Sequence, residues 1–150
     1  MLNDSLKITG DVSVKVYNEK TGAPVDSREI KNLVVTTGKV FIAAAMLKTT
    51  TNSPAAMTHM AAGAGTTAAA VGDTALGSEL GRVTLASATS TGAVVTYTAT
   101  FPAGTATGAV TEAGVLNAGS GGTLLCRTVF AVVNKGTDDA MSVTWQITVS

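Results

Sequence analysis

The chain has 150 residues, a length that suits one domain with a core of its own. Ten basic and ten acidic residues give a formal net charge of zero, so no basic excess is present to bind nucleic-acid phosphates. Only 13% of the residues are charged and 45% are hydrophobic, so small uncharged side chains must make up much of the surface. A surface with few charges does little to prevent protein molecules from associating with one another. We therefore expect a single domain over residues 1–150 that forms homo-oligomers and does not bind nucleic acid.

Cysteine usage and hydropathy indicate the cell compartment in which the protein is made. Cys126 is the single cysteine, which excludes an internal disulfide and a paired-cysteine metal site. No apolar run reaches the roughly 18 residues of a membrane span, and the first seven residues lack the basic start of a signal peptide. We expect synthesis in a reducing cytoplasm, no membrane partner, and a flexible arm at residues 1–5.

The first third of the chain predicts a hairpin followed by a helix. Apolar and polar residues alternate over 6–18, and a second strand is expected over 25–35 after a turn that contains Gly22. A helix is predicted over 38–47 because apolar residues and three alanines follow at helical spacing, with Thr36 or Thr37 as its cap.

The middle of the chain predicts short strands separated by small polar residues. A strand is expected over 56–62, a loop over 66–78, one strand within 79–90 and another over 92–101. Period-two alternation in the last of these places Tyr97 on the apolar face.

The last third predicts a hairpin and a final strand. Residues 107–134 form two apolar strands around a glycine-rich turn at 118–122, and residues 141–149 alternate with Trp145 on the core side. The total of seven or eight strands with turns between them predicts a mainly β chain. The expected architecture is an antiparallel β-sandwich, jelly-roll-like, with one short helix.

One carboxylate lies inside an apolar strand. Glu112 stands between Val110 and Val115, and a carboxylate inside a sheet must face water or be paired with a donor. Arg82, near Glu79 at the start of another strand, is the expected partner because its planar fork suits a carboxylate. The alternative is that Glu112 faces water on the threonine-rich side.

Residues with catalytic or metal-binding chemistry are sparse. His59 is the single histidine and its neighbours offer no partner, and Cys126 lies in mid-strand, where a buried and inert thiol is expected. The adjacent Asp138 and Asp139 are too few for a calcium site, and Gly38-Lys39 lacks the spacing of a phosphate loop. We expect no enzyme activity, no cofactor and no bound metal.

Three blocks, in order, resemble a known family. They are MTHMAAGAGTT at 57–67, DTALGSELGRV at 73–83, and VTEAGVLN at 110–117 followed by GTLLCR. Together they resemble the N-terminal module of tailed-phage tail-collar fibre proteins. The segment from LKITGDV to NLVVTTGK is also similar to the start of small phage structural proteins. The resemblance covers residues 57–127, and the chain ends without the repetitive shaft of a fibre.

The resemblance implies structural roles and no catalytic residues. It implies framework positions, to which the core alternation adds a tryptophan: Glu79, Arg82, Glu112, Gly114 and Trp145. It implies a virion protein made in the bacterial host cytoplasm that self-associates and docks on major capsid, neck or tail proteins, as a capsid decoration, a collar or a tail adaptor. The alternative function is a tail-fibre module that binds a host-surface receptor or glycan. Residues 1–5 and 64–78 are the expected contact elements.

Overall fold

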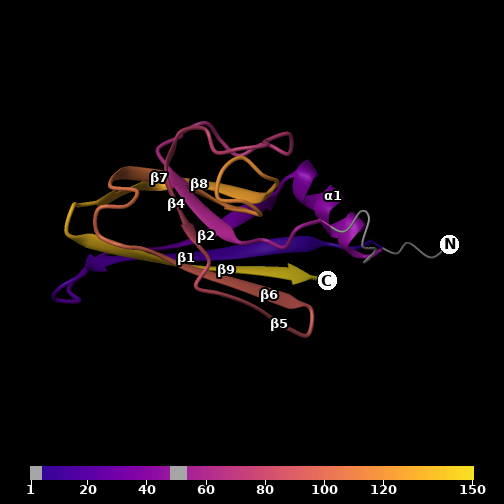
Figure 1. The fold of residues 1–150 in the computed structure, drawn as a ribbon, viewed down its shortest axis with the longest axis horizontal. Helices are drawn as coiled ribbons and strands as arrows, with labels where there is room; N and C mark the ends of the chain where they lie inside the picture. Colours follow the sequence, from indigo (N-terminus) through magenta and orange to yellow (C-terminus); the bar gives the residue numbers. More distant parts are fainter. Residues whose placement is uncertain (1–4, 48–53) are drawn as a thin grey trace.

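The computed structural model describes residues 5–47 and 54–150, and the described chain forms nine strands and one helix (Figure 1). The strands are β1 (Ile8–Asn18), β2 (Pro24–Val34), β3 (His59–Gly63), β4 (Glu79–Thr84), β5 (Ser87–Thr91), β6 (Val94–Phe101), β7 (Gly108–Leu116), β8 (Leu124–Lys135) and β9 (Asp139–Val149), and the helix is α1 (Thr36–Ala45). Residues 1–4 of the expected N-terminal arm lie outside the described part, and Ser5 is exposed.

Alternation in the sequence becomes alternation in burial where one face of a strand meets the core. In β1 the buried residues are Gly10, Val12, Val14 and Val16, and the residues between them are exposed or half-buried. In β9 Trp145 is fully buried, while Thr144 and Gln146 on either side are exposed. The strands predicted at the two ends of the chain are therefore confirmed in type and in the face they bury.

All nine strands belong to one antiparallel sheet in the order β4-β3-β7-β8-β2-β1-β9-β6-β5. β2 joins two ladders, because its residues from Pro24 to Asn32 pair with β1 whereas Leu33 and Val34 pair with β8. The sheet curls, so that β4 at one edge comes into contact with β6 near the other edge. We call the strands on either side of β2 the two ladders of the sheet: β1, β9, β6 and β5 form one, and β8, β7, β3 and β4 form the other. Figure 1 shows these two ladders on opposite sides of the molecule.

The main core lies inside this curl and draws on both ladders. Phe101 and Trp145 from one ladder share it with Met60 and Val115 from the other. The mainly β class and the single short helix within 5–47 and 54–150 are confirmed. The strands form one curled sheet, and the jelly-roll-like sandwich stays a prediction.

Helix α1 lies at one end of the molecule (Figure 1), where it packs on β8. A Cβ atom on Gly38 would lie 2.0 Å from the Leu125 carbonyl oxygen, so only glycine allows the helix to approach this closely. The expected threonine cap is wrong: Val35 is the N-cap residue, and the Thr37 hydroxyl donates instead to the Leu124 carbonyl at 2.7 Å.

One further correction concerns residues 79–90. The sequence predicts one strand there, but two are present, because β4 ends at Thr84 and β5 begins at Ser87. β4 pairs with β3, whereas β5 pairs with β6. The alternating small residues of β5 leave no apolar face by which sequence periodicity could identify it.

Candidate functional site

The segment of residues 64–78 connects β3 to β4 as a closed loop, which we call the 64–78 loop. Its two ends are joined because the Ala64 N–H donates to the Ser78 carbonyl at 2.8 Å. A further backbone bond, from the Thr36 N–H to the Val71 carbonyl at 2.7 Å, attaches the middle of the loop to the start of α1. The loop predicted over 66–78 is therefore present, and it is held in a fixed shape.

Glu112 of β7 is the centre of the contacts that hold this loop. Its side chain is fully buried. One carboxylate oxygen, Oε1, accepts hydrogen bonds from the backbone N–H groups of Gly65 at 2.8 Å and Ser78 at 2.7 Å. The other, Oε2, accepts from the N–H of Gly77 at 2.8 Å. One buried carboxylate thus binds both ends of the loop.

Arg127 of β8 supplies the opposite charge. Its Nε and a terminal nitrogen lie 2.9 and 2.8 Å from Glu112 Oε2. The other terminal nitrogen donates to Asp73 Oδ2 at 2.7 Å, and the guanidinium also donates to the Thr67 carbonyl at 3.1 Å. Because the Arg127 side chain is 3% exposed, these bonds form away from bulk water and are strong.

The surroundings of the two carboxylates set their pKa values. Burial alone raises the pKa of Glu112, but the hydrogen bonds from Ser78, Gly77, Arg127 and Gly65 outweigh it, so this pKa is held below its usual value. The pKa of Asp73 is also lowered, first by the hydrogen bond from the Ala70 N–H and then by Arg127, against the effect of burial. Both carboxyl groups are therefore ionised at neutral pH.

Two glycines make room for this network. A Cβ atom on Gly65 would lie 2.4 Å from Glu112 Oε1, so any larger residue would displace the carboxylate. A Cβ atom on Gly114, one of the predicted framework residues, would lie 2.7 Å from Leu76 and 2.9 Å from Leu124. Gly114 is paired directly with Arg127 across the β7–β8 ladder. These glycines of the first and third sequence blocks thus allow the loop to approach the sheet.

The predicted pairing of Glu112 with Arg82 is wrong. Arg82 forms a two-bond fork with Glu79, with both N–O distances at 2.8 Å. Its remaining nitrogen donates to the carbonyls of Ala118 and Gly121 at 2.8 and 2.9 Å, which fastens the glycine-rich turn of the β7–β8 hairpin to β4. The alternative, in which Glu112 faces water, is also wrong, because Glu112 is fully buried.

Three other residues discussed in the sequence analysis, Trp145, Cys126 and His59, lie in other parts of the structure. Trp145 lies in the core, where its indole Nε1 has no hydrogen-bond partner in the described part of the chain. Cys126 is buried, and burial raises the pKa of its thiol, which makes it an inert group as predicted. His59 contacts its neighbour Thr58, with 2.8 Å between Nδ1 and the hydroxyl oxygen. The structure does not bring these three residues to the 64–78 loop.

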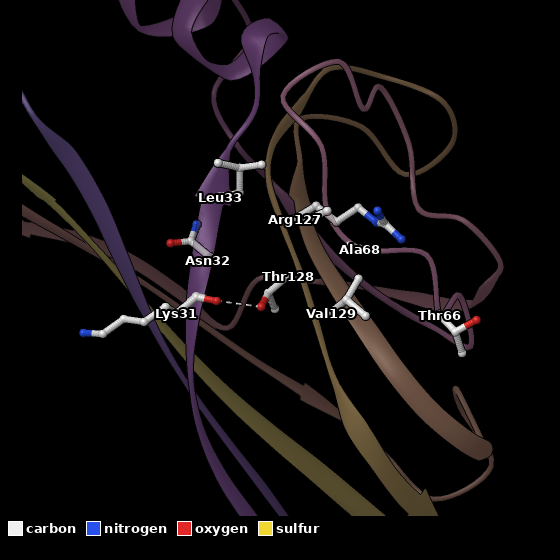
Figure 2. Close-up of a pocket in the computed structure, with 9 residues that line it drawn as sticks. Lys31, Asn32, Leu33, Thr66, Ala68, Arg127, Thr128 and Val129 are labelled. Atoms are coloured by element: carbon white, nitrogen blue, oxygen red, sulfur yellow. Dashed lines mark hydrogen bonds between the residues drawn. The ribbon is translucent and has the colours of Figure 1, made fainter.

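A hollow of about 410 Å³ lies between this loop and the ends of β2 and β8. Figure 2 shows Arg127 reaching from β8 toward the loop, with Thr66 and Ala68 beside the hollow and Lys31 across it. The hydroxyl of Thr128 donates to the Lys31 carbonyl at 2.9 Å, which bridges the strands where their ladder has ended. The Arg127 charge beside the hollow is already paired with Glu112 and Asp73.

Over 5–47 and 54–150, no three histidine, cysteine, aspartate or glutamate side chains gather as a metal site would require. Within the same ranges, no helix has the length and apolar character needed to cross a membrane.

Comparisons with protein-family models, with curated proteins and with solved structures return no significant match for this chain.

Proposed function

We propose that the protein is a structural component of a tailed-phage virion that self-associates and docks on the particle surface as a capsid decoration, a collar or a tail adaptor. The partners are other copies of this chain and the major capsid, neck or tail proteins. In this proposal the two ladders of the curled sheet act as the layers of a jelly-roll-like sandwich. The assignment to a virion is supported by the sequence resemblance to tail-collar fibre modules over residues 57–127.

The observation that carries the proposal is the buried ion pair of Glu112 and Arg127. Burying two charges costs several kcal/mol per ion unless their hydrogen bonds are satisfied. Here both partners form hydrogen bonds with backbone groups of the 64–78 loop. A loop held in this way keeps one shape before it meets a partner, and preorganisation lowers the entropic cost of binding.

The outer surface of the 64–78 loop suits contact with a protein. Its exposed residues are small and uncharged, and Val71 at its middle is 54% exposed. Small side chains lose little conformational entropy when an interface orders them. We propose that this loop contacts a neighbouring protein of the particle.

Purified phage particles provide the direct test. Mass spectrometry of particles from the phage that encodes this chain is expected to detect it in fixed stoichiometry with the capsid or tail proteins. Addition of the purified protein to particles that lack it is expected to restore the bound copies, and Val71→Asp is expected to weaken that binding. Absence of the chain from purified particles would overturn the proposal, and specific binding on a glycan array would favour the receptor-binding fibre module.

A further inference from the structure

β5 is the final strand at one edge of the sheet, and no strand of the described chain pairs with its outer side. All five of its residues, SATST, are exposed. Natural edge strands commonly carry a lysine, another charge or a proline, which prevents pairing with other chains. β5 has none of these, so it is an open edge on which a strand can be added.

The hydrogen bonds of neighbouring strands establish which groups of β5 point outward. The N–H of Val149 in β9 donates to the carbonyl of Ala93 at 3.0 Å. Alternate residues of a strand bond to opposite neighbours, so residues 93, 95 and 97 bond to β9 and residues 94, 96 and 98 bond to β5. The register of β5 with β6 assigns those bonds to residues 91, 89 and 87. Ala88 and Ser90 therefore direct their N–H and C=O groups to the open edge.

We propose that β5 pairs antiparallel with β5 of a second copy about a two-fold axis at Thr89. This inference rests on the proposed function, because it names the surface by which the copies associate. Ala88 of one copy faces Ser90 of the other, and this pair occurs twice. The result is four N–H···O bonds between the two backbones. Thr89 lies beside Thr89 of the second copy on the outer face of the joined sheet.

The chemistry of β5 selects a second copy over other partners. A helix or an apolar side chain would leave the outward backbone groups without hydrogen bonds, whereas a strand satisfies them. The segment is uncharged and reads similarly in both directions, so two copies oppose threonine, serine and alanine with no charge left unpaired.

The outer face of the sheet continues this pattern inward. Ser87 lies against Thr98, with their hydroxyl oxygens 2.5 Å apart, and Thr98 is paired with Thr144 of β9. Pairing of two β5 strands joins these hydroxyl rows of the two copies into one surface.

The expected dimer is weak in solution. Five residues from each copy bury less than the roughly 1,200 Å² at the lower end of stable protein interfaces. A particle that carries many copies strengthens such a contact through a high effective concentration. The measurement in solution therefore uses protein concentrations up to about millimolar.

A charge at the two-fold axis tests the pairing. In Thr89→Lys two ammonium groups face each other across the axis, and the dimer dissociation constant measured by sedimentation is expected to rise by about fivefold or more. An equal mixture of Thr89→Lys and Thr89→Glu is expected to restore the dimer as a heterodimer. Thr144→Lys is the matched control, because it adds the same charge to the same exposed face away from the edge.

A cross-link captures even a weak dimer. Opposed residues in a non-hydrogen-bonded antiparallel pair have Cα atoms about 4.5 Å apart, which is within the range of a disulfide. Thr89→Cys is expected to form a covalent dimer on mild oxidation, and Thr144→Cys is not. Cys126 is buried and does not compete.

The outcomes separate this inference from the proposed function. If the protein oligomerises but the Thr89 variants behave like the Thr144 variants, the β5 pairing is overturned and self-association stands. If the protein is monomeric throughout and Thr89→Cys does not cross-link, both fall. Open-ended oligomers would indicate pairing of β5 with β4 of the next copy and would overturn the two-fold arrangement.

Discussion

Replacement of Glu112 with glutamine keeps the size of a fully buried side chain but removes its charge and one of its two acceptor oxygens. Four N–H groups donate to the carboxylate: two to Oε1, from Gly65 and Ser78, and two to Oε2, from Gly77 and the Arg127 Nε. A terminal nitrogen of Arg127 adds an ion-pair contact with Oε2 at 2.8 Å. The amide nitrogen of glutamine must face one of these sets. At least two hydrogen bonds are therefore lost, and donors are left facing a donor.

The magnitude follows from the burial of the pair. Removal of one partner of a buried ion pair costs about 3–5 kcal/mol. Arg127 keeps Asp73 as a partner, so the lower end, about 3 kcal/mol of unfolding free energy, is expected. For a domain of this size each kcal/mol lowers Tm by about 2–4 °C, so Tm is expected to fall by about 6–12 °C.

Urea titration followed by fluorescence measures this loss, because Trp145 is the single tryptophan and is buried. Hydrogen exchange adds a local measurement: the amides of Gly65, Gly77 and Ser78 are expected to lose protection in Glu112→Gln. Glu29→Gln is the control, since Glu29 is exposed and bonds only a serine hydroxyl among the described residues. Its effect is expected to stay within about 0.5 kcal/mol. A loss below about 1 kcal/mol in Glu112→Gln, or an equal loss in both variants, would refute the role given to the buried pair.

Three other predictions concern the remaining charges. The folded-state pKa values of Glu112 and Asp73 lie below their ordinary values, so their contribution is complete above about pH 5 and is lost as pH falls through the folded-state values; acid titration of Asp73→Asn is expected to show a shallower loss than the parent protein. Arg82→Met is expected to lower the unfolding free energy by about 1–2 kcal/mol, because Glu79 and two turn carbonyls lose their donor; a change within error in urea titration would show that this fork is not needed. Lys135 is 1% exposed and burial lowers its pKa, so its charged form is disfavoured on folding; Lys135→Met is expected to leave stability unchanged or raise it at pH 7, and a loss above about 2 kcal/mol in thermal unfolding would contradict this reasoning.

Strands with one buried face were the part of the fold that could be predicted from sequence. Alternation placed β1 and β9 and identified Trp145 as a core residue because each of these strands meets the core on a single face. β5 shows the limit of this reasoning: its five residues are all exposed, so no periodic signal separates it from a loop. The curl of the sheet depends on how distant strands pair, which a local pattern does not contain.

The candidate site was predicted in part. The sequence identified Glu112 as a charge that needs a partner and the 64–78 loop as a connection, but it assigned the wrong arginine. Arg127 belongs to the hairpin that the sequence predicted, but it is paired with Gly114, whereas Glu112 is opposite Val129, so counting from the turn does not identify it as the partner. What counting does not supply is the return of the loop onto the carboxylate, because those bonds come from backbone N–H groups that every residue type except proline carries.

The pairing of the first strand with the last controls the order in which this chain can fold. β1 is paired along its whole length with β9, from Ile8 opposite Val149 to Asn18 opposite Asp139. β6 also pairs with β9, so β1 and β6 each lack one of their two neighbours until β9 has been synthesised. The β1–β2 hairpin and the β7–β8 hairpin close locally and can form during synthesis. Completion of the sheet is thus a late event of high contact order, and folding of the whole is expected to be slow relative to that of its hairpins.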